Sequence, residues 1–269
     1  DAVLEAIEKK AAADGTDFWF ERWGEILQPS DWPFLPAHPD LAKGFRRESD
    51  ILDVWLDSGV SWLAVLGEDA VADLYLEGSD QHRGWFQSSL VMSTALLGKA
   101  PYKAVLTHGF VLDEKGRAMH KSTGNVVAPQ EVIAVWGADL LRLWVALSDY
   151  SDDVRISDKL LAGPADSYRR VRNTFKYLLG SLDGFESAKA TPFNELPEME
   201  RYLLHRLAAL QKDVLEDYRA YRYRDAARRL VDFCAFDLSA LYLDGTKDRL
   251  YTFKLESPER LAAQTVMAD

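Results

Sequence analysis

Residues 73–86 read Asp-Leu-Tyr-Leu-Glu-Gly-Ser-Asp-Gln-His-Arg-Gly-Trp-Phe, and this stretch indicates how the surrounding chain folds. The short apolar run at 73–76 is typical of a buried strand, and residues 86–97 have the pattern of a helix. A glycine and four side chains that can form hydrogen bonds therefore lie at a turn from strand to helix. In an open α/β sheet, ligands bind at such turns.

A second polar loop lies at residues 116–125, which read Gly-Arg-Ala-Met-His-Lys-Ser-Thr-Gly-Asn. This loop has glycines near both ends and a lysine beside a hydroxyl. It follows a predicted strand at 102–111, which separates it from the first loop. Two polar loops with a strand between them predict a nucleotide site.

The composition sets limits on the class of protein. The chain has 269 residues, of which 48% are apolar and 28% charged, and these fractions are typical of a soluble globular protein. A net charge of −11 argues against wholesale coating of a phosphate backbone, although it permits a local basic face. The single cysteine, Cys234, excludes a disulfide framework and a multi-cysteine zinc site within this chain, and it predicts a reducing, cytoplasmic location.

Strand and helix patterns alternate in the first part of the chain, which predicts an α/β fold with a parallel sheet. Residues 14–50 hold several prolines and predict loops with short elements. The predicted strands lie at 50–56, 73–76 and 102–111, and the predicted helices at 1–13, 83–97, 129–135 and 138–147. We expect the chain to be a piece of a longer protein.

From about residue 157 the pattern becomes almost entirely helical, which predicts a helical bundle. Two apolar stripes have the spacing of buried helix faces. They are Leu203, Leu207, Leu210 and Val214, and Ala227, Leu230, Cys234, Leu238 and Leu241. Residues 181–198 read as a break between helices. We therefore predict one domain at 1–156 and a second at 157–269.

Several motifs together resemble one family. They are Asp-Val-Trp-Leu-Asp-Ser-Gly at 53–59, the polar run at 77–86, Thr-His-Gly-Phe at 107–110 and Met-His-Lys-Ser at 119–122. Their order and spacing resemble the class I aminoacyl-tRNA synthetases, and among these the isoleucine-specific subtype. The resemblance continues through 137–144 and 166–173, and covers roughly residues 45–250. It implies the second half of a Rossmann-like catalytic domain, followed by an incomplete all-α anticodon-binding bundle.

This resemblance implies a reaction for the longer enzyme. ATP would activate isoleucine as isoleucyl-adenylate, with Mg²⁺ accompanying ATP, and isoleucine would then pass to its tRNA. The parent is expected to be monomeric. The isolated chain is expected to be inactive, since nothing in it resembles the first nucleotide loop or the editing domain of the family. An alternative remains open, namely a non-catalytic module that binds tRNA or protein on a synthetase scaffold.

The resemblance also assigns site residues. Lys121 and Ser122 would act in catalysis, because a lysine is a mobile point charge suited to a leaving pyrophosphate. A solvated surface lysine is the alternative. The residues implied for ATP or adenylate binding are Glu77, Gly78, Asp80, Gln81, His108, Gly109, Met119 and Lys121. Glu77 suits a ribose hydroxyl or an α-ammonium group.

The lysine loop departs from the family pattern of Lys-Met-Ser-Lys-Ser at two positions. The matching residues here are Ala118, Met119, His120, Lys121 and Ser122. Ala118 replaces the first lysine, so one cationic contact to phosphate is missing. His120 replaces the middle serine and could supply a hydrogen-bond donor.

Two further groups of residues have roles that the resemblance implies. Trp55 and Trp85 would form walls of the isoleucine side-chain pocket, although aromatic residues more often pack in a core. Five arginines on two predicted helices would contact tRNA, with ordinary surface ion pairs as the alternative. They are Arg169, Arg172, Arg222, Arg224 and Arg229. No metal-binding residues are predicted.

Overall fold

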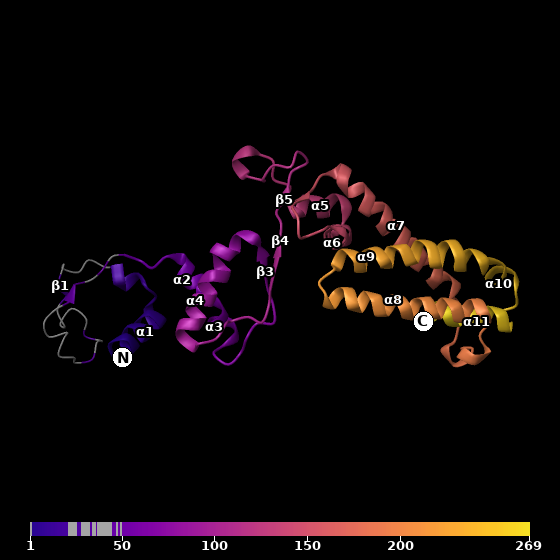
Figure 1. Cartoon of the computed structure of the whole chain (residues 1–269), viewed down its shortest axis with the longest axis horizontal. Helices are drawn as coiled ribbons and strands as arrows, with labels where there is room; N and C mark the ends of the chain where they lie inside the picture. The colour runs from indigo at the N-terminus through magenta and orange to yellow at the C-terminus, as the bar shows by residue number, and fades with distance from the viewer. Residues whose placement is uncertain are drawn as a thin grey trace. The chain divides into compact units, whose positions relative to one another are not determined.

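The computed structural model describes residues 2–20, 26–27, 33, 36, 45–46, 48 and 50–269. Most of the predicted irregular region at 14–50 therefore lies outside the described residues, including Pro29 and Pro39. Contacts divide the chain into two compact units. Figure 1 labels helices and strands along the chain. The first contains Asp1–Ala72 and His82–Pro101, and the second contains Asp73–Gln81 and Tyr102–Asp269. None of the helices within the described ranges is long and apolar enough to cross a membrane.

The first unit is mainly helical. Its helices are α1 (Ala2–Asp14), α2 (Val54–Gly59), α3 (Ser61–Leu66) and α4 (Trp85–Leu97), and its strands β1 (Ile26–Leu27) and β2 (Phe45–Arg46) pair antiparallel. The predicted helices at 1–13 and 83–97 are confirmed as α1 and α4. Helix α2 packs closely on α4 because Gly59 has no side chain: a Cβ there would lie 3.1 Å from Met92 Cγ and from the Ser88 carbonyl oxygen.

The strand predicted at 50–56 is wrong. The chain instead enters α2 at Val54, and the Asp53 carboxylate accepts the Trp55 backbone N–H at 2.8 Å. This is the N-cap bond that Asp commonly forms at a helix start, and it outweighs the strand propensity of the neighbouring apolar residues. Ile51, Leu52 and Val54 are exposed.

Two parallel strand pairs lie in the second unit, as the alternating pattern predicts. Strand β3 (Tyr75–Gly78) pairs with β4 (Val105–His108), and β5 (Val111–Leu112) pairs with β6 (Val154–Arg155). The predicted strand at 73–76 is confirmed as β3, displaced by two residues. The single strand predicted at 102–111 is divided into β4 and β5.

The division falls at Gly109, where another segment approaches the backbone. The Gly109 N–H donates to the Tyr150 carbonyl at 2.8 Å, and the Phe110 N–H donates to the Asp153 carboxylate at 2.7 Å. A Cβ on Gly109 would lie 2.3 Å from the Asp152 carbonyl oxygen. Only glycine therefore permits this approach.

The rest of the second unit is helical. Its elements are α5 (Pro129–Trp136), α6 (Ala138–Leu147), α7 (Asp158–Ser181), α8 (Glu198–Arg219), α9 (Tyr223–Asp232), a π-helix (Phe233–Leu243), α10 (Lys247–Thr252) and α11 (Pro258–Ala268). The predicted helices at 129–135 and 138–147 are confirmed, and the predicted break at 181–198 separates α7 from α8. The domain boundary near residue 157 stays a prediction.

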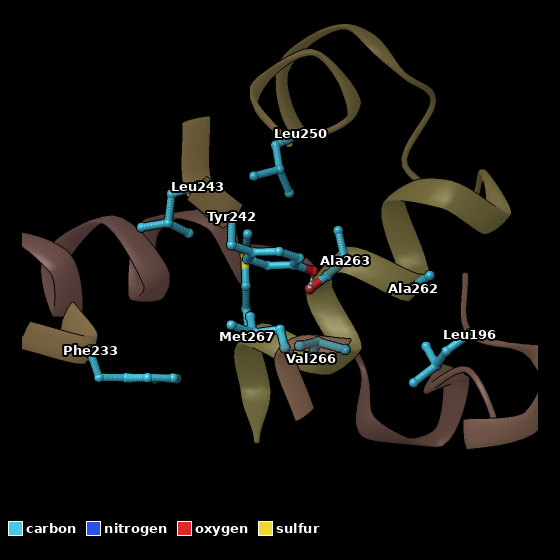
Figure 2. Close-up of a cluster of buried hydrophobic side chains, with 10 residues drawn as sticks. Leu196, Phe233, Tyr242, Leu243, Leu250, Ala262, Ala263, Val266 and Met267 are labelled. Atoms are coloured by element: carbon cyan, nitrogen blue, oxygen red, sulfur yellow. Dashed lines mark hydrogen bonds between the residues drawn. The ribbon is translucent and has the colours of Figure 1, made fainter. Parts of the chain in front are cut away.

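A hydrophobic core holds the helices together (Figure 2). Tyr242 is fully buried there, and its hydroxyl donates to the Ala263 carbonyl at 3.4 Å. Leu203 is buried in this core, and Leu207 and Leu210 pack against it. The first predicted stripe is therefore confirmed as a core face of α8 at these three leucines, whereas Val214 is half-buried and lies outside this core cluster.

The second predicted stripe is wrong in part. Leu230 and Leu241 are exposed, whereas Ala226, Phe233 and Tyr242 are buried. Leu230 lies in α9, whereas from Phe233 to Leu243 the chain is π-helical and departs from the α-helical period that the stripe assumed. A π-helix has more residues per turn, so its buried face departs from a 3.6-residue spacing.

Gly109→Ala is expected to destabilise the second unit by about 1–3 kcal/mol, because the added methyl group must displace the backbone at Asp152. Urea unfolding of the chain measures this change. Gly180→Ala is the matched control: Gly180 lies within α7 with nothing within 4 Å of an added Cβ. That control should raise stability by about 0.5–1 kcal/mol. If Gly109→Ala were as stable as the wild type, the close approach of the Asp152 backbone to Gly109 would be contradicted.

Candidate functional site

Strands β3 and β4 end at the same edge, because they are parallel and in register. Glu77 lies opposite Thr107, and Gly78 opposite His108. The structure thus brings together two segments that the sequence predicts as site residues, 77–78 and 108–109. Glu77 is exposed at this edge and His108 is half-buried.

Polar side chains gather around Gly78. A Cβ on Gly78 would lie 2.6 Å from the Asp80 Oδ1 atom, so the Asp80 carboxylate lies against the glycine backbone. The Gln81 amide donates to Asp80 Oδ2 at 3.0 Å. Asp80 and Gln81 therefore form one group with both acceptors and donors next to Gly78.

His108 has a defined orientation. Its Nδ1 atom lies 2.8 Å from the Gly109 carbonyl oxygen. A carbonyl oxygen can only accept, so Nδ1 is the donor of this hydrogen bond. The Gly109 backbone is fixed on one side by His108 and on the other by Tyr150.

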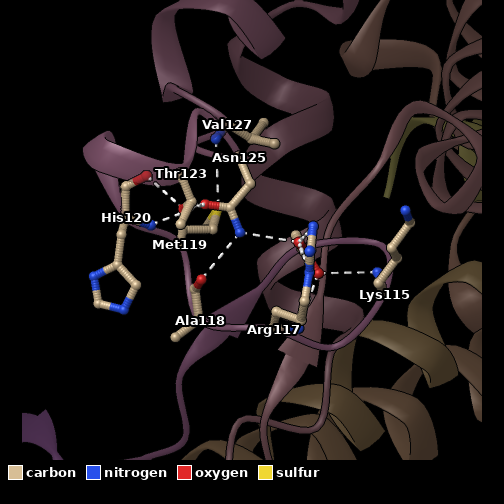
Figure 3. A network of polar contacts seen from close by, with 9 residues as sticks. Lys115, Arg117, Ala118, Met119, His120, Thr123, Asn125 and Val127 are labelled. Carbon is tan, nitrogen blue, oxygen red and sulfur yellow. Dashed lines mark hydrogen bonds and ion pairs between the residues drawn. The ribbon is translucent and has the colours of Figure 1, made fainter.

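The loop that carries Lys121 follows β5 (Figure 3). Ala118 forms an antiparallel bridge with Leu112, and a 3₁₀ turn spans Lys121–Thr123. The Met119 side chain packs on a second hydrophobic cluster, formed by Val132, Trp144, Ile156 and Leu161. Met119 thus anchors the loop in the fold.

Lys121 and Ser122 are exposed at the tip of this loop. The Lys121 ammonium makes no hydrogen bond or ion pair within the part of the chain that the structure describes. Its charge is therefore available to a ligand.

A buried carboxylate lies behind the loop. Asp113 is 7% exposed and accepts the backbone N–H groups of Lys115 and Arg117 at 2.9 and 2.8 Å. It also accepts from the Arg117 guanidinium and from the Asn125 amide. The Asn125 amide and the Arg117 N–H groups hold the pKa of Asp113 far below its usual value, so the group stays charged.

Sequence reasoning did not predict Asp113 or Asn125 as functional residues. The available signal was Gly124–Asn125, which closes the polar loop, because asparagine side chains commonly bond the backbone of turns. Asp113 gave a weaker signal, since a carboxylate directly after an apolar strand is usually solvated.

The two predicted pocket tryptophans have different environments in the first unit. Trp55 is 46% exposed and lines a groove of about 460 Å³ between α2 and α4, together with Leu56, Val91 and Met92. Trp85 is outside the set of groove-lining residues. Its indole N–H lies 3.0 Å from the Ser58 carbonyl oxygen and 3.1 Å from Ser61 Oγ, so it ties α4 to α2 and α3.

Four of the five predicted tRNA-binding arginines contact carboxylates. Arg169 pairs with Asp166 at 2.8 Å and Arg224 with Asp149 at 3.1 Å. Arg222 and Arg229 both pair with Asp217, at 2.7 and 2.9 Å. Arg172 has no ion pair among the residues described by the structure.

Asp217 lies in the last turn of α8, next to the turn that leads into α9. It is 2% exposed, and its backbone carbonyl accepts the Arg222 N–H at 2.8 Å. The turn also contains Tyr221 at φ 58°, a left-handed conformation that few non-glycine residues adopt. The Tyr150 hydroxyl donates to the Tyr221 carbonyl at 2.6 Å and holds this turn against the 149–153 segment.

Comparison with protein families gives two matches. The family described as "tRNA synthetases class I (I, L, M and V)" matches residues 12–157, and "Anticodon-binding domain of tRNA ligase" matches residues 200–269.

Similar curated proteins carry the name isoleucine–tRNA ligase. That of Brevibacillus brevis is 48% identical over 273 aligned positions, which cover 100% of this chain and 29% of the relative. That of Caldanaerobacter subterraneus is 48% identical over 272 positions, which cover 99% of this chain and 29% of the relative. The chain thus spans less than a third of the length of these relatives.

Solved structures share the fold. A LeuRS–tRNA–LeuAMS ternary complex from Agrobacterium radiobacter has a TM-score of 0.69 at 20% identity, over 88% of this chain and 31% of that chain. Methionyl-tRNA synthetase of Mycobacterium tuberculosis, in complex with methionyl-adenylate, has a TM-score of 0.62 at 18% identity, over 85% of this chain and 46% of that chain. At these identities the likeness shows the mixed α/β and helical fold alone.

Asp217→Asn is expected to lower the free energy of unfolding at neutral pH, since two guanidinium groups would face a neutral amide. The Arg222 guanidinium holds the pKa of Asp217 below its usual value. The contribution of the carboxylate is therefore complete above the unfolded pKa of about 3.9 and is lost as the pH falls through the lower folded value.

Urea unfolding between neutral and acidic pH measures this dependence. The difference between wild type and Asp217→Asn should shrink as the pH falls below about 4. Asp225→Asn is the matched control, because Asp225 is exposed and lies 4.0 Å from Arg222. If the difference in the free energy of unfolding between wild type and Asp217→Asn did not change with pH, the role assigned to the Asp217 carboxylate would be contradicted.

Proposed function

We propose, because this chain belongs to the family of class I tRNA synthetases (I, L, M and V), that the whole protein activates isoleucine with ATP and transfers it to tRNA. The observation that carries this proposal is the 48% identity to isoleucine–tRNA ligases over the whole chain. Since the chain spans less than a third of those relatives, the activity is assigned to the longer protein.

The polar edge of β3 and β4 would hold the adenylate. Glu77 would accept from a ribose hydroxyl or from the α-ammonium group of isoleucine, and Asp80 and Gln81 would lie beside the ribose. Gly78 lets the Asp80 carboxylate lie against the backbone on the ribose side, and the His108–Gly109 segment would meet the adenine. Met119 would support this side of the site.

Lys121 would act on charge that develops during the reaction. An isoleucine carboxylate oxygen attacks the α-phosphorus of ATP, and the bond from that phosphorus to the bridging oxygen breaks. The leaving pyrophosphate gains negative charge, which the Lys121 ammonium would stabilise, with Ser122 as a neighbouring donor. No covalent bond to the protein is needed, because positioning and charge stabilisation supply the catalysis.

Magnesium would enter with ATP. The described residues contain no group of three or more His, Cys, Asp or Glu side chains that could hold a metal ion. Mg²⁺ commonly keeps several waters and binds substrate phosphates, so the ligands would come chiefly from ATP.

The isoleucine side chain would contact the groove that Trp55 lines in the first unit. Trp85 would support this groove through its bonds to the α2–α3 segment. An apolar pocket discriminates weakly between side chains that differ by one methylene group.

The helical part would bind tRNA. Its match to an anticodon-binding domain and the five arginines Arg169, Arg172, Arg222, Arg224 and Arg229 support this role. The whole protein would be monomeric and cytoplasmic.

A second candidate is a non-catalytic module that binds tRNA or protein. It is favoured by Ala118 and His120, which depart from the usual loop pattern. ATP–pyrophosphate exchange by the intact protein separates the two functions. Isoleucine should give a higher kcat/KM than valine, leucine or methionine, and no exchange with any of them would favour the module. The isolated chain should remain at background.

Lys121→Ala in the intact protein should lower kcat for isoleucine-dependent exchange by roughly 10²–10³-fold, since its charge acts mainly in the transition state. The KM for isoleucine should change little. Lys159→Ala, an exposed lysine at the start of α7, is the matched control. A raised KM with normal kcat would be inconsistent with the proposed role.

Arg172→Gln should weaken tRNA binding by the intact protein and lower its salt slope by about 1, because one phosphate contact is lost. Arg222→Gln should do the same while also lowering stability, since it leaves the buried Asp217 with one partner fewer. Affinity across a salt series measures the slope. Arg201→Gln on α8 is the control. If neither Arg172→Gln nor Arg222→Gln changed the salt slope, these two arginines would be ordinary surface residues that do not contact tRNA phosphates.

A further inference from the structure

We infer that Asn125 and Asp113 are positioning residues that hold the backbone of the lysine loop so that Lys121 faces the nucleotide. This inference rests on the proposed function and adds two residues that neither the sequence motifs nor the comparisons assign. It is carried by a continuous set of hydrogen bonds behind the loop (Figure 3).

Asn125 bonds the loop on both sides of Lys121. Its Oδ1 atom accepts the His120 backbone N–H at 2.9 Å and lies 2.6 Å from the Thr123 hydroxyl. That hydroxyl also lies 2.9 Å from the His120 carbonyl oxygen, so its one proton bonds either acceptor. The amide group of Asn125 thus fixes the residues that precede and follow the Lys121–Ser122 pair.

The other end of the Asn125 side chain is fixed as well. Its Nδ2 group donates to the Ala118 carbonyl at 3.0 Å and to Asp113 Oδ2 at 2.9 Å. Both protons of the amide therefore have acceptors, and its orientation is determined by charge: the amide N–H₂ faces the carboxylate, and the amide oxygen faces the His120 N–H.

Asp113 connects the loop to the sheet. It directly follows β5, and its own N–H donates to the Arg117 carbonyl at 3.0 Å. A carboxylate buried to this extent is stable only when its acceptor sites are occupied. Here the Lys115, Arg117 and Asn125 groups occupy them. Loss of the Asn125 amide would leave Asp113 Oδ2 with Arg117 as its partner.

These bonds use only backbone atoms of the two positions that depart from the family loop. Ala118 contributes its carbonyl oxygen and His120 its N–H and carbonyl groups. Any side chain other than that of proline at either position leaves the same groups in place. The substitutions at Ala118 and His120 are therefore compatible with a correctly placed Lys121.

These hydrogen bonds determine where the Lys121 side chain can lie. Its long side chain has no partner within the described residues, so its position depends on where the 3₁₀ turn places its Cα atom. A lysine side chain has large rotational freedom, and a shifted turn would place the ammonium away from the pyrophosphate. Asn125 and Asp113 thus act through Lys121 without touching substrate.

The test uses the intact protein and four variants: Asn125→Ala, Lys121→Ala, the double variant, and Asn194→Ala as an exposed asparagine control. Isoleucine-dependent ATP–pyrophosphate exchange gives kcat and KM, and amide hydrogen exchange over residues 118–124 reports the loop. Asn125→Ala should lower kcat by roughly 10- to 100-fold, the scale for displacement of a reacting group by about 1 Å. It should also speed hydrogen exchange in the loop, whereas Asn194→Ala should change neither.

The double variant tests whether Asn125 acts through Lys121. Its kcat should equal that of Lys121→Ala, because a displaced backbone has no further effect once the ammonium is absent. Losses that multiply, an unchanged kcat in Asn125→Ala, or unchanged loop exchange would each overturn the inference. An inactive wild type would refute the proposed function and the positioning role together, whereas an active wild type with an unaffected Asn125→Ala would refute only the latter.

Discussion

A buried negative charge constrains the loop that carries Lys121. Asp113 is nearly inaccessible to water, and a carboxylate in that position is costly unless hydrogen-bond donors surround it. The chain supplies these donors from the turn at Lys115 and Arg117 and from Asn125. Asn125 also accepts the His120 backbone N–H. The hydrogen bonds that the buried Asp113 carboxylate needs therefore also fix the backbone next to the exposed Lys121.

A second constraint comes from glycines at the strand ends. Gly78 admits the Asp80 carboxylate, and Gly109 admits the backbone of Asp152, at distances that no Cβ atom tolerates. The parallel register of β3 and β4 then places Glu77 and His108 at one edge. Rigid strand ends with polar side chains, followed by an exposed lysine on a fixed turn, suit a reaction that depends on positioning and charge.

The sequence predicted the elements with clear periodicity and missed those decided by single contacts. Helices α4, α5 and α6 and the parallel pairing follow from apolar patterns and turn residues. The false strand at 50–56 arose because the N-cap bond of Asp53 is a local choice that the apolar pattern does not reveal. Likewise, the exposure of Leu241 follows from a π-helix that no α-helical spacing predicts. The motif residues of the candidate site were found by resemblance, but Asn125 required knowledge of which backbone groups it reaches.

We propose that the edge of β3 and β4 and the lysine loop form one nucleotide site. Amide hydrogen exchange of the intact protein, with and without ATP and isoleucine together, tests this claim most directly. We predict slower exchange at residues 77–81, 107–110 and 118–125 when both substrates are present, and a smaller change with ATP alone. Protection confined to one of these segments, or absent from all three, would contradict the account.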